Sequence, residues 1–382
     1  MRREFLLVAA ILVFLTGCRM VGINQSNPPD VLYSAKISSA TRPAPEVKIR
    51  ATVPAPAAPS PTKLFTPTQS PTPAPTATQI PSPTPTPPAM SIQAMRARSY
   101  PGSDIIIVNE LDPGANYRRY YTYYLSDGLK IFALLTVPNG EMPVGGWPGI
   151  VFNHGYIPPK EYRTTERYIA YVDRLARAGY IVFRIDYRGN DRSEGVATGA
   201  YGDPGYTVDV LNGVASLQRY LQINPQKIGM WGHSMGGFLT LRAMVISKAI
   251  KAGVIWSGVV GSYQDMLSNW HRSGPTPTPR PDGRSWRVEW IEQYGTPEKN
   301  PAFWSSISAN SFLTDLSGPL QLHHGTADGE VPLEFSVKLA SDIWAAGGVA
   351  DLYTYSENDH NIAQSFDLAM DRTIEFFDRY LK

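Results

Sequence analysis

The chain has 382 residues, and its 43% of apolar residues is enough to bury the core of one large domain or of two small ones. The formal net charge is +2 and the charged residues form no basic stripe, so we expect no nucleic-acid partner. Cys18 is the single cysteine, which excludes an internal disulfide.

Residues 1–17 have the pattern of a secretory signal peptide. Two arginines precede an apolar run at 5–15, which is too short to be a comfortable membrane-spanning helix. The run ends in Leu-Thr-Gly-Cys, which resembles the lipobox of bacterial lipoproteins and implies cleavage before Cys18 and lipid attachment to its thiol. We therefore expect an extracytoplasmic lipoprotein anchored to a membrane through Cys18. The alternative is a plain signal peptide with an incidental cysteine.

Residues 18–95 are predicted to be a disordered tether. The segment is rich in Pro, Thr, Ser and Ala, and 66–88 is close to a Pro-Thr-Pro-Ser repeat. Such a composition buries too little apolar surface to offset the entropy of ordering, and its prolines favour extended conformations. We expect a semi-rigid spacer between the membrane and the folded part. Partner recognition through the PxxP pattern is the alternative.

Residues 96–382 show short apolar runs that alternate with helical patterns, as expected of one α/β domain. The expected strands are 129–137, 149–153, 180–186, 227–232, 252–257, 319–324 and 350–355. The expected helices are 165–178, 206–221, 235–247, 333–346 and 364–381. This alternation predicts a mostly parallel central sheet with helices on both faces, and chemistry at the carboxyl ends of its strands.

A nucleophile motif lies where the strand at 227–232 meets the next helix. Residues 232–236 read Gly-His-Ser-Met-Gly, which fits Gly-x-Ser-x-Gly in the strand–turn–helix context of a nucleophile elbow. Side chains in place of the two glycines would clash in so tight a turn, which holds Ser234 Oγ above the sheet. We predict Ser234 as the nucleophile. The alternative is a glycine-rich turn with an idle serine.

The next strand ends supply an acid and a base in the chain order that this kind of fold uses. Asp328 follows the strand at 319–324, and His360 follows the strand at 350–355. A serine hydroxyl needs a general base, so we predict that His360 takes the proton of Ser234 and returns it to the leaving group. Asp328 is predicted to hold the tautomer of the imidazole and to stabilise its charged form.

The remaining ionisable side chains in these loops are assigned other roles. Glu330 lies two residues beyond the predicted acid and Asp359 is adjacent to the predicted base, so neither is expected to complete the triad. His154 and His324 are expected to brace turns, and His233 to contact neighbouring loops. No pair of histidines has metal-ligand spacing with a nearby carboxylate, so we expect no catalytic metal and no cofactor.

Two backbone N–H groups are predicted to form an oxyanion hole. The first belongs to Met235, directly after the nucleophile, and the second to Tyr156, on the loop after the strand at 149–153. Such donors stabilise the tetrahedral anion by about 3 kcal/mol each. The alternative for the second loop is an ordinary turn that ends a strand.

From Tyr124 to the C-terminus the sequence resembles the catalytic domain of the prolyl-oligopeptidase (S9) serine peptidases. The resemblance is carried by residues 126–131, 186–189, 228–237, 294–300 and 324–328 with the Val-Pro pair at 331–332. It implies an α/β-hydrolase fold. Full members usually carry a β-propeller before this domain, where this chain has the tether. Many members also use a tyrosine hydroxyl in a Tyr-Gly-Gly context in the oxyanion hole, whereas Tyr156 follows His-Gly here.

A cap-like insertion is expected at about 261–304. It contains Trp270, Trp286, Trp290 and Trp304. The insertion is interpreted either as a cap that supplies apolar walls for the acyl group or as a packed surface loop whose tryptophans cover the sheet.

The predicted function is that of a serine hydrolase that forms an acyl-enzyme on peptide or carboxylic ester bonds, with a short peptide or small ester as substrate. Two alternatives stay open. One is a carboxylesterase of small or aromatic esters, and the other is a tethered lipoprotein that binds without catalysis.

Overall fold

The computed structural model describes residues 88–270 and 285–382. The predicted signal peptide, the lipidation at Cys18 and the tether up to residue 87 lie outside the described residues, as does the segment 271–284 of the predicted insertion. Within the two described ranges, no helix combines the length and the apolar character that a bilayer crossing requires.

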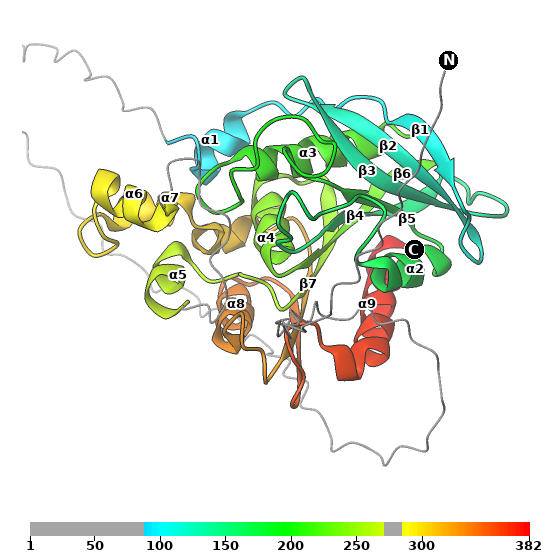
Figure 1. The fold of residues 1–382 in the computed structure, drawn as a ribbon. Coiled ribbons are helices and arrows are strands. Elements are labelled where there is room, and N and C mark those ends of the chain that lie inside the picture. Colours follow the sequence, from blue (N-terminus) through cyan, green and yellow to red (C-terminus); the bar gives the residue numbers. More distant parts are fainter. Residues whose placement is uncertain (1–87, 271–284) are drawn as a thin grey trace, which may run out of the picture. The chain divides into compact units, whose positions relative to one another are not determined.

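A nine-stranded sheet runs through the domain in the order β1-β2-β3-β5-β4-β6-β7-β8-β9 (Figure 1). The strands are β1 (Ile106–Leu111), β2 (Tyr117–Ser126), β3 (Leu129–Pro138), β4 (Trp147–Asn153), β5 (Ile181–Ile185), β6 (Ile223–His233), β7 (Ile250–Trp256), β8 (Leu320–Gly325) and β9 (Ala350–Tyr355). The strands from β5 to β9 in this order pair in parallel, and β1, β2 and β3 are antiparallel. The mostly parallel sheet that the sequence predicted is confirmed.

The first two strands were not predicted. β2 and β3 form a hairpin in which Ser126 pairs with Leu129 across Asp127 and Gly128. Both turn residues have positive φ, of 52° and 79° respectively, and Asp-Gly is a favoured sequence for such a two-residue turn. The tyrosine-rich run at 117–124 before this turn was the available signal for the missed strand.

The helices cover both faces of the sheet, as expected. Their bounds are α1 (Ile92–Ala97), α2 (Ile169–Arg177), α3 (Gly205–Gln218), α4 (Met235–Ile246), α5 (Tyr263–Asn269), α6 (Trp286–Tyr294), α7 (Pro301–Ile307), α8 (Leu333–Ala345) and α9 (Phe366–Leu381), with 3₁₀ turns at Ala309–Asp315 and Ala363–Ser365. α2 starts four residues later than predicted because Arg167 and Tyr168 have left-handed φ values of 58° and 51°, which a right-handed helix cannot include.

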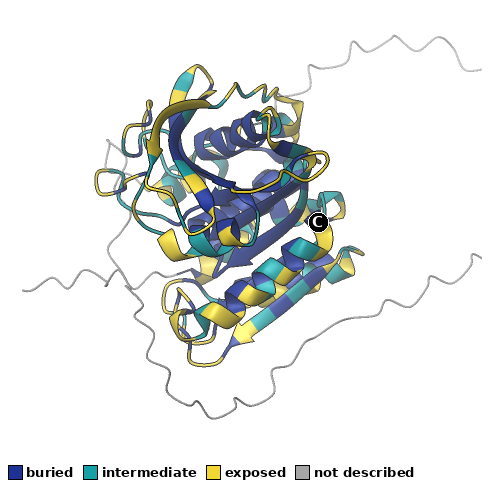
Figure 2. Cartoon of the chain, turned by 90° about the vertical axis from the view of Figure 1, so that its right-hand side faces the viewer, coloured by how far each residue is buried: buried dark blue, intermediate teal, exposed yellow. Residues whose placement is uncertain are grey.

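Alternation along the strands divides the core into two layers. On β7, Val254 and Trp256 pack with α2 and α9, whereas Ile255 between them packs with α3, α4 and α8. This is the period-two pattern of a strand that is buried on both faces. Accordingly, the central strands are dark blue in Figure 2, and exposed residues gather on loops and outer helix faces.

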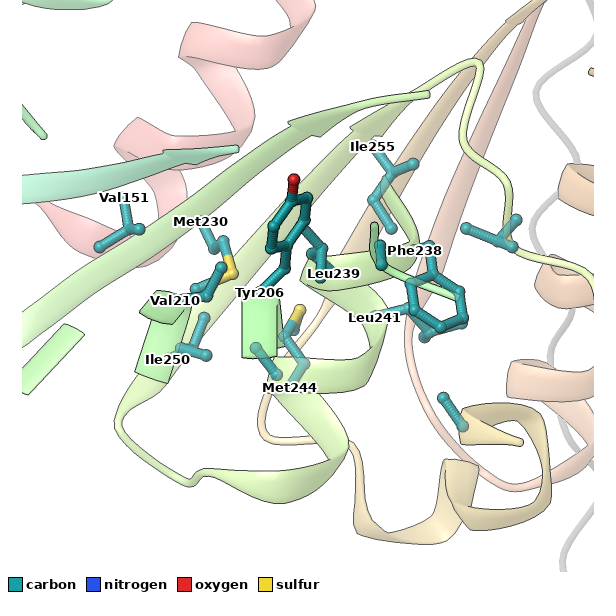
Figure 3. Packing of buried hydrophobic residues seen from close by; sticks show 14 of the residues in the cluster. Val151, Tyr206, Val210, Met230, Phe238, Leu239, Leu241, Met244, Ile250 and Ile255 are labelled. Carbon is teal, nitrogen blue, oxygen red and sulfur yellow. The ribbon is translucent and has the colours of Figure 1, made fainter. Parts of the chain in front are cut away.

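Helix α4, which follows the nucleophile, is buried almost all round. Leu239 and Met244 lie among side chains of the neighbouring strands, including Met230 and Ile255 (Figure 3). Even Arg242 on this helix is fully buried. A helix that is buried on nearly every side is typical of a core position, and it gives Ser234 a rigid support.

The folded domain begins earlier than the predicted residue 96. Ile92 and Met95 on α1 are buried in the core beside α4, and Met90 is also buried. The buried Arg242 guanidinium donates to the main-chain carbonyls of Met90 and Ile307. Residues 90–95, which were assigned to the tether, therefore belong to the domain.

Candidate active site

Ser234 occupies a strained turn between β6 and α4. Its φ of 54° and ψ of −117° lie outside the regions that non-glycine residues favour. A Cβ at Gly236 would lie 2.0 Å from the Asn153 carbonyl oxygen, and one at Gly232 would lie 2.3 Å from the Gly236 carbonyl oxygen. Both positions therefore need glycine, and the turn has the geometry of the predicted nucleophile elbow.

Asp328 lies on the loop after β8, and its carboxylate accepts four hydrogen bonds. Oδ1 accepts from the backbone N–H groups of Glu330 (2.8 Å) and Val331 (3.0 Å). Oδ2 accepts from His360 Nδ1 (2.8 Å) and His324 Nε2 (3.1 Å). Burial alone raises the pKa of Asp328, but the bonds with His324 and His360 outweigh it and leave the pKa well below its usual range. The carboxylate is therefore held ionised.

His360 lies on the loop after β9 and is buried. Because Nδ1 donates to the carboxylate of Asp328, Nε2 is the nitrogen that can accept a proton. A carboxylate oxygen of Glu330 lies 4.0 Å from Nε2. The approach of the two loops depends on Gly325 at the end of β8, where a Cβ would lie 2.2 Å from the Asn358 carbonyl oxygen.

The histidine loop reaches the nucleophile through His233, the residue before Ser234. His233 Nε2 donates to the main-chain carbonyl of His360 over 3.0 Å, and the centroids of the two rings are 4.6 Å apart. The structure thus brings the loops of all three predicted triad residues to one end of the parallel strands.

The loop after β4 lies directly against Ser234. A Cβ at Gly155 would lie 2.7 Å from the Tyr168 hydroxyl oxygen and 3.2 Å from Ser234 Cβ, so a larger residue would push this loop away. Tyr156 follows on the same loop and is half-buried, and Met235 is the first residue of α4. The first N–H groups of a helix have no partner within it, which leaves the Met235 amide available beside Ser234. Both predicted oxyanion donors therefore belong to segments that flank the nucleophile.

A hydrogen-bond chain joins this loop to the histidine loop, and the sequence did not predict it. The Gly155 N–H donates to the Tyr168 hydroxyl over 2.9 Å, and that hydroxyl lies 2.7 Å from His233 Nδ1. Since His233 Nε2 donates to a carbonyl, Nδ1 must accept the proton of Tyr168. Burial lowers the pKa of His233 to about 3, which keeps its ring neutral and these directions fixed.

The other two histidines of interest brace turns, as expected. His154 stacks between Tyr162 and Tyr187, with ring centroids at 4.3 and 4.4 Å, and burial lowers its pKa to about 3. His324 also bonds to Ser336 Oγ over 2.8 Å, which links the acid loop to α8. Its direct bond to the predicted acid was missed, because nothing in the sequence indicates which way a buried ring points.

An aromatic cluster, formed by Tyr201, Phe238, Tyr263, Trp270, Trp286 and Trp290, lies beside the predicted nucleophile. Phe238 is one helical turn after Ser234, and its ring centroid is 5.0 Å from that of Tyr201. Trp270 donates through Nε1 to the Glu330 carbonyl on the acid loop. Trp270, Trp290 and Trp304 are all buried in the main core, and Trp270 also contacts the loop of the predicted acid.

The Prolyl oligopeptidase family model matches residues 167–382, more than half of the chain. The uncharacterized peptidase YtmA of Bacillus subtilis is 26% identical over 65% of this chain and 88% of that protein. Human dipeptidyl peptidase 8 is 24% identical over 63% of this chain, which spans only 26% of that protein.

Solved structures show the same fold. The acylaminoacyl peptidase of Pyrococcus horikoshii matches with a TM-score of 0.55 at 25% identity, over 70% of this chain and 42% of that one. Acetyl xylan esterase 1 of Thermoanaerobacterium matches with a TM-score of 0.56 at 16% identity, over 76% of this chain and 95% of that one. The chain therefore belongs to the prolyl oligopeptidase family and is a serine hydrolase with the α/β-hydrolase fold.

Proposed function

We propose that Ser234, His360 and Asp328 form a catalytic triad that hydrolyses peptide or carboxylic ester bonds through an acyl-enzyme. The observation that carries the proposal is the 2.8 Å bond from His360 Nδ1 to Asp328, on a loop that His233 ties to the nucleophile elbow. This arrangement supports Nε2 as the base for Ser234 Oγ.

The reaction then proceeds in two halves. Ser234 Oγ attacks the carbonyl carbon while its proton passes to His360, and the backbone N–H groups of Met235 and Tyr156 stabilise the oxyanion. The tetrahedral intermediate collapses, the leaving amine or alcohol takes the proton from His360, and the acyl group remains on Ser234. A water molecule then attacks the acyl-enzyme by the same steps and releases the carboxylic acid product from Ser234.

The family points to short peptides as the first substrate class. Small carboxylic esters are the second class, because the same groups cleave them by the same steps. The activity of the wild-type chain on p-nitrophenyl acetate and on peptide p-nitroanilides with free or blocked amino termini distinguishes the two. If only peptides with free amino termini react, the esterase alternative is wrong.

The nucleophile is tested by covalent labelling. A fluorophosphonate probe should label the wild-type chain and Ser356→Ala, which removes an exposed hydroxyl elsewhere, but not Ser234→Ala. We expect Ser234→Ala to lower kcat by at least about 10⁴-fold. An unlabelled wild-type chain without turnover would support the alternative of a binding lipoprotein.

We also propose that Cys18 is lipidated and holds the chain at a membrane outside the cytoplasm. The support is the Leu-Thr-Gly-Cys sequence that follows the apolar run. In cells grown with labelled palmitate, the full chain should incorporate label and enter the detergent phase on Triton X-114 partition, and Cys18→Ala should do neither. A soluble, unlabelled wild-type chain would exclude the anchor.

A further inference from the structure

Arg287, on the first turn of α6, is a half-buried cation that lies against the aromatic cluster. Its guanidinium carbon is 5.4 Å from the ring centroid of Trp270 and 5.6 Å from that of Trp286. Among the described residues, it forms no ion pair, and its one hydrogen bond is from Nη1 to the main-chain carbonyl of Trp270, at 3.2 Å. A guanidinium has five N–H donors, so most of its capacity is not used by this contact.

Two paths of contacts lead from the candidate active site to Trp270, and from there to Arg287. One path runs from Ser234 to Phe238 on the same helix and then to Tyr201, which contacts Trp270 with ring centroids 5.3 Å apart. Arg287 lies directly over that indole.

The second path starts at the predicted base. Glu330 Oε2 lies 4.0 Å from His360 Nε2, and the Glu330 carbonyl accepts from Trp270 Nε1 over 2.9 Å. Trp270 is therefore linked to both the predicted base and the predicted nucleophile, and the Arg287 guanidinium lies over its ring.

A purely structural role leaves most N–H donors of Arg287 unused within the described residues. Burial lowers the pKa of its guanidinium, which means that the charge is held here at a cost in solvation. Deeply placed arginines elsewhere in the domain are compensated in two ways: Arg188 pairs with Asp209 at 2.7 Å, and Arg242 donates to two main-chain carbonyls. Arg287 instead contacts two indole rings and one carbonyl, so its remaining N–H groups can still bind an anion.

We propose that Arg287 binds a carboxylate of the substrate and thereby selects acidic peptides or carboxylate-bearing esters. A guanidinium can bind a carboxylate through two parallel hydrogen bonds, and the two indole rings hold the plane of the guanidinium. The inference rests on the proposed hydrolase function and names the substrate class of that same site.

The test uses substrate pairs that differ only by a carboxylate. These are N-succinyl- against N-acetyl-Ala-Ala p-nitroanilide, and the 4-nitrophenyl monoester of glutaric acid against 4-nitrophenyl butyrate. For the full wild-type chain we expect kcat/KM to be about tenfold higher for the anionic member of at least one pair, on the scale of one charge-assisted hydrogen bond. Added salt should reduce this ratio.

Variants then assign the preference to Arg287. Arg287→Met should raise KM for the anionic substrate about tenfold and leave the neutral substrate within about twofold, and Arg287→Lys should restore part of the preference. Arg219→Met is the matched control, because it removes an exposed arginine that pairs with Asp104 and should leave the ratio unchanged. A purely structural role would instead lower activity on both members of a pair equally.

The outcomes separate this inference from the proposed function. If the wild-type chain is labelled by the fluorophosphonate and cleaves neutral and anionic substrates equally well, the role of Arg287 is overturned and the hydrolase function stands. If Arg287→Met does not fold, the role of Arg287 is still decided by the wild-type ratio, its salt dependence and the Arg287→Lys variant. A chain with no labelling and no turnover overturns both proposals.

Discussion

At the scale of single residues, glycines decide how closely the loops of the proposed active site approach each other. Gly155 lets the loop after β4 reach Ser234, Gly236 lets α4 approach β4, and Gly325 lets the loop of Asp328 meet the loop of His360. In each case the atom nearest to a Cβ would be a rigid one, on the main chain or on a fixed side chain. The substitution therefore has to move a loop that carries chemistry.

We predict that Gly325→Ala lowers kcat on the order of 100-fold. Its Cβ would lie 2.2 Å from the Asn358 carbonyl and 2.4 Å from that of Asp359, so the loop of His360 must shift away from Asp328. Gly329→Ala is the control, because nothing lies within 4 Å of a Cβ there and it is on the same loop. Equal kcat values for the two variants would contradict the argument.

Tyr168→Phe tests the hydrogen-bond chain from Gly155 to His233. The change leaves His233 Nδ1 without its donor and Gly155 N–H without its acceptor. We expect kcat to fall about tenfold with little change in KM, and the free energy of unfolding to fall by roughly 1–3 kcal/mol. Tyr180→Phe, which removes a hydroxyl bonded to Asp378, should affect stability alone. An unaltered kcat in Tyr168→Phe would mean that these hydrogen bonds do not position the loop of Tyr156.

At the scale of elements, residues that follow the parallel strands anchor neighbouring loops through buried hydrogen bonds. Asp186 follows β5 and accepts from the hydroxyls of Tyr162 (2.7 Å) and Thr164 (2.6 Å), which anchor the segment between β4 and α2. Burial raises the pKa of Asp186 to about 7, although both hydroxyl bonds act in the opposite direction. The protonation of this carboxyl group therefore makes the free energy of unfolding depend on pH.

We predict that Asp186 makes the protein less stable as the pH rises from about 4 to about 7. The folded state keeps a proton that the unfolded state, with a pKa of about 3.9, releases, so the stabilisation is complete below that pH and is lost by about pH 7. A shift of about three units corresponds to on the order of 4 kcal/mol.

Urea unfolding at several pH values measures this effect. The stability of the wild-type chain relative to Asp186→Asn should decline between pH 4 and pH 7 and then level off. Asp104→Asn removes an exposed carboxylate and should follow the wild-type curve. Parallel curves for the wild type and Asp186→Asn would show that the carboxyl group does not titrate in this range.

At the scale of the whole molecule, the N-terminal boundary of the domain decides what can be removed. Ile92 and Met95 are buried on α1, and the Met90 carbonyl accepts from the buried Arg242. We predict that a chain of residues 88–382 is as stable as the full chain, whereas 98–382 loses roughly 3–6 kcal/mol through exposure of two apolar side chains. Thermal unfolding of the two truncations checks this, and equal stability would place α1 outside the cooperative unit.

The local pattern of the sequence was sufficient for the main architecture, and it led to the three triad residues that we propose. Period-two and helical patterns identify buried strands and helices, and Gly-x-Ser-x-Gly between them marks an elbow because only glycine fits so tight a turn. Asp328 and His360 could be chosen because parallel strands end at one edge of the sheet. Strand β1 is exposed to solvent on both faces, so its sequence shows no alternation of apolar and polar residues, and the strand was missed.

Only the tertiary structure could decide which side chains meet across these loops. Packing sets the relative placement of the segments that meet in three contacts: the bond of His324 to Asp328, the hydrogen bond of Tyr168 with His233, and the contact of Arg287 with the Trp270 ring. The sequence by itself determined which chemical groups are present and on which strand ends they lie. Their contacts required the fold, because side-chain direction and loop approach depend on neighbours that are distant along the chain.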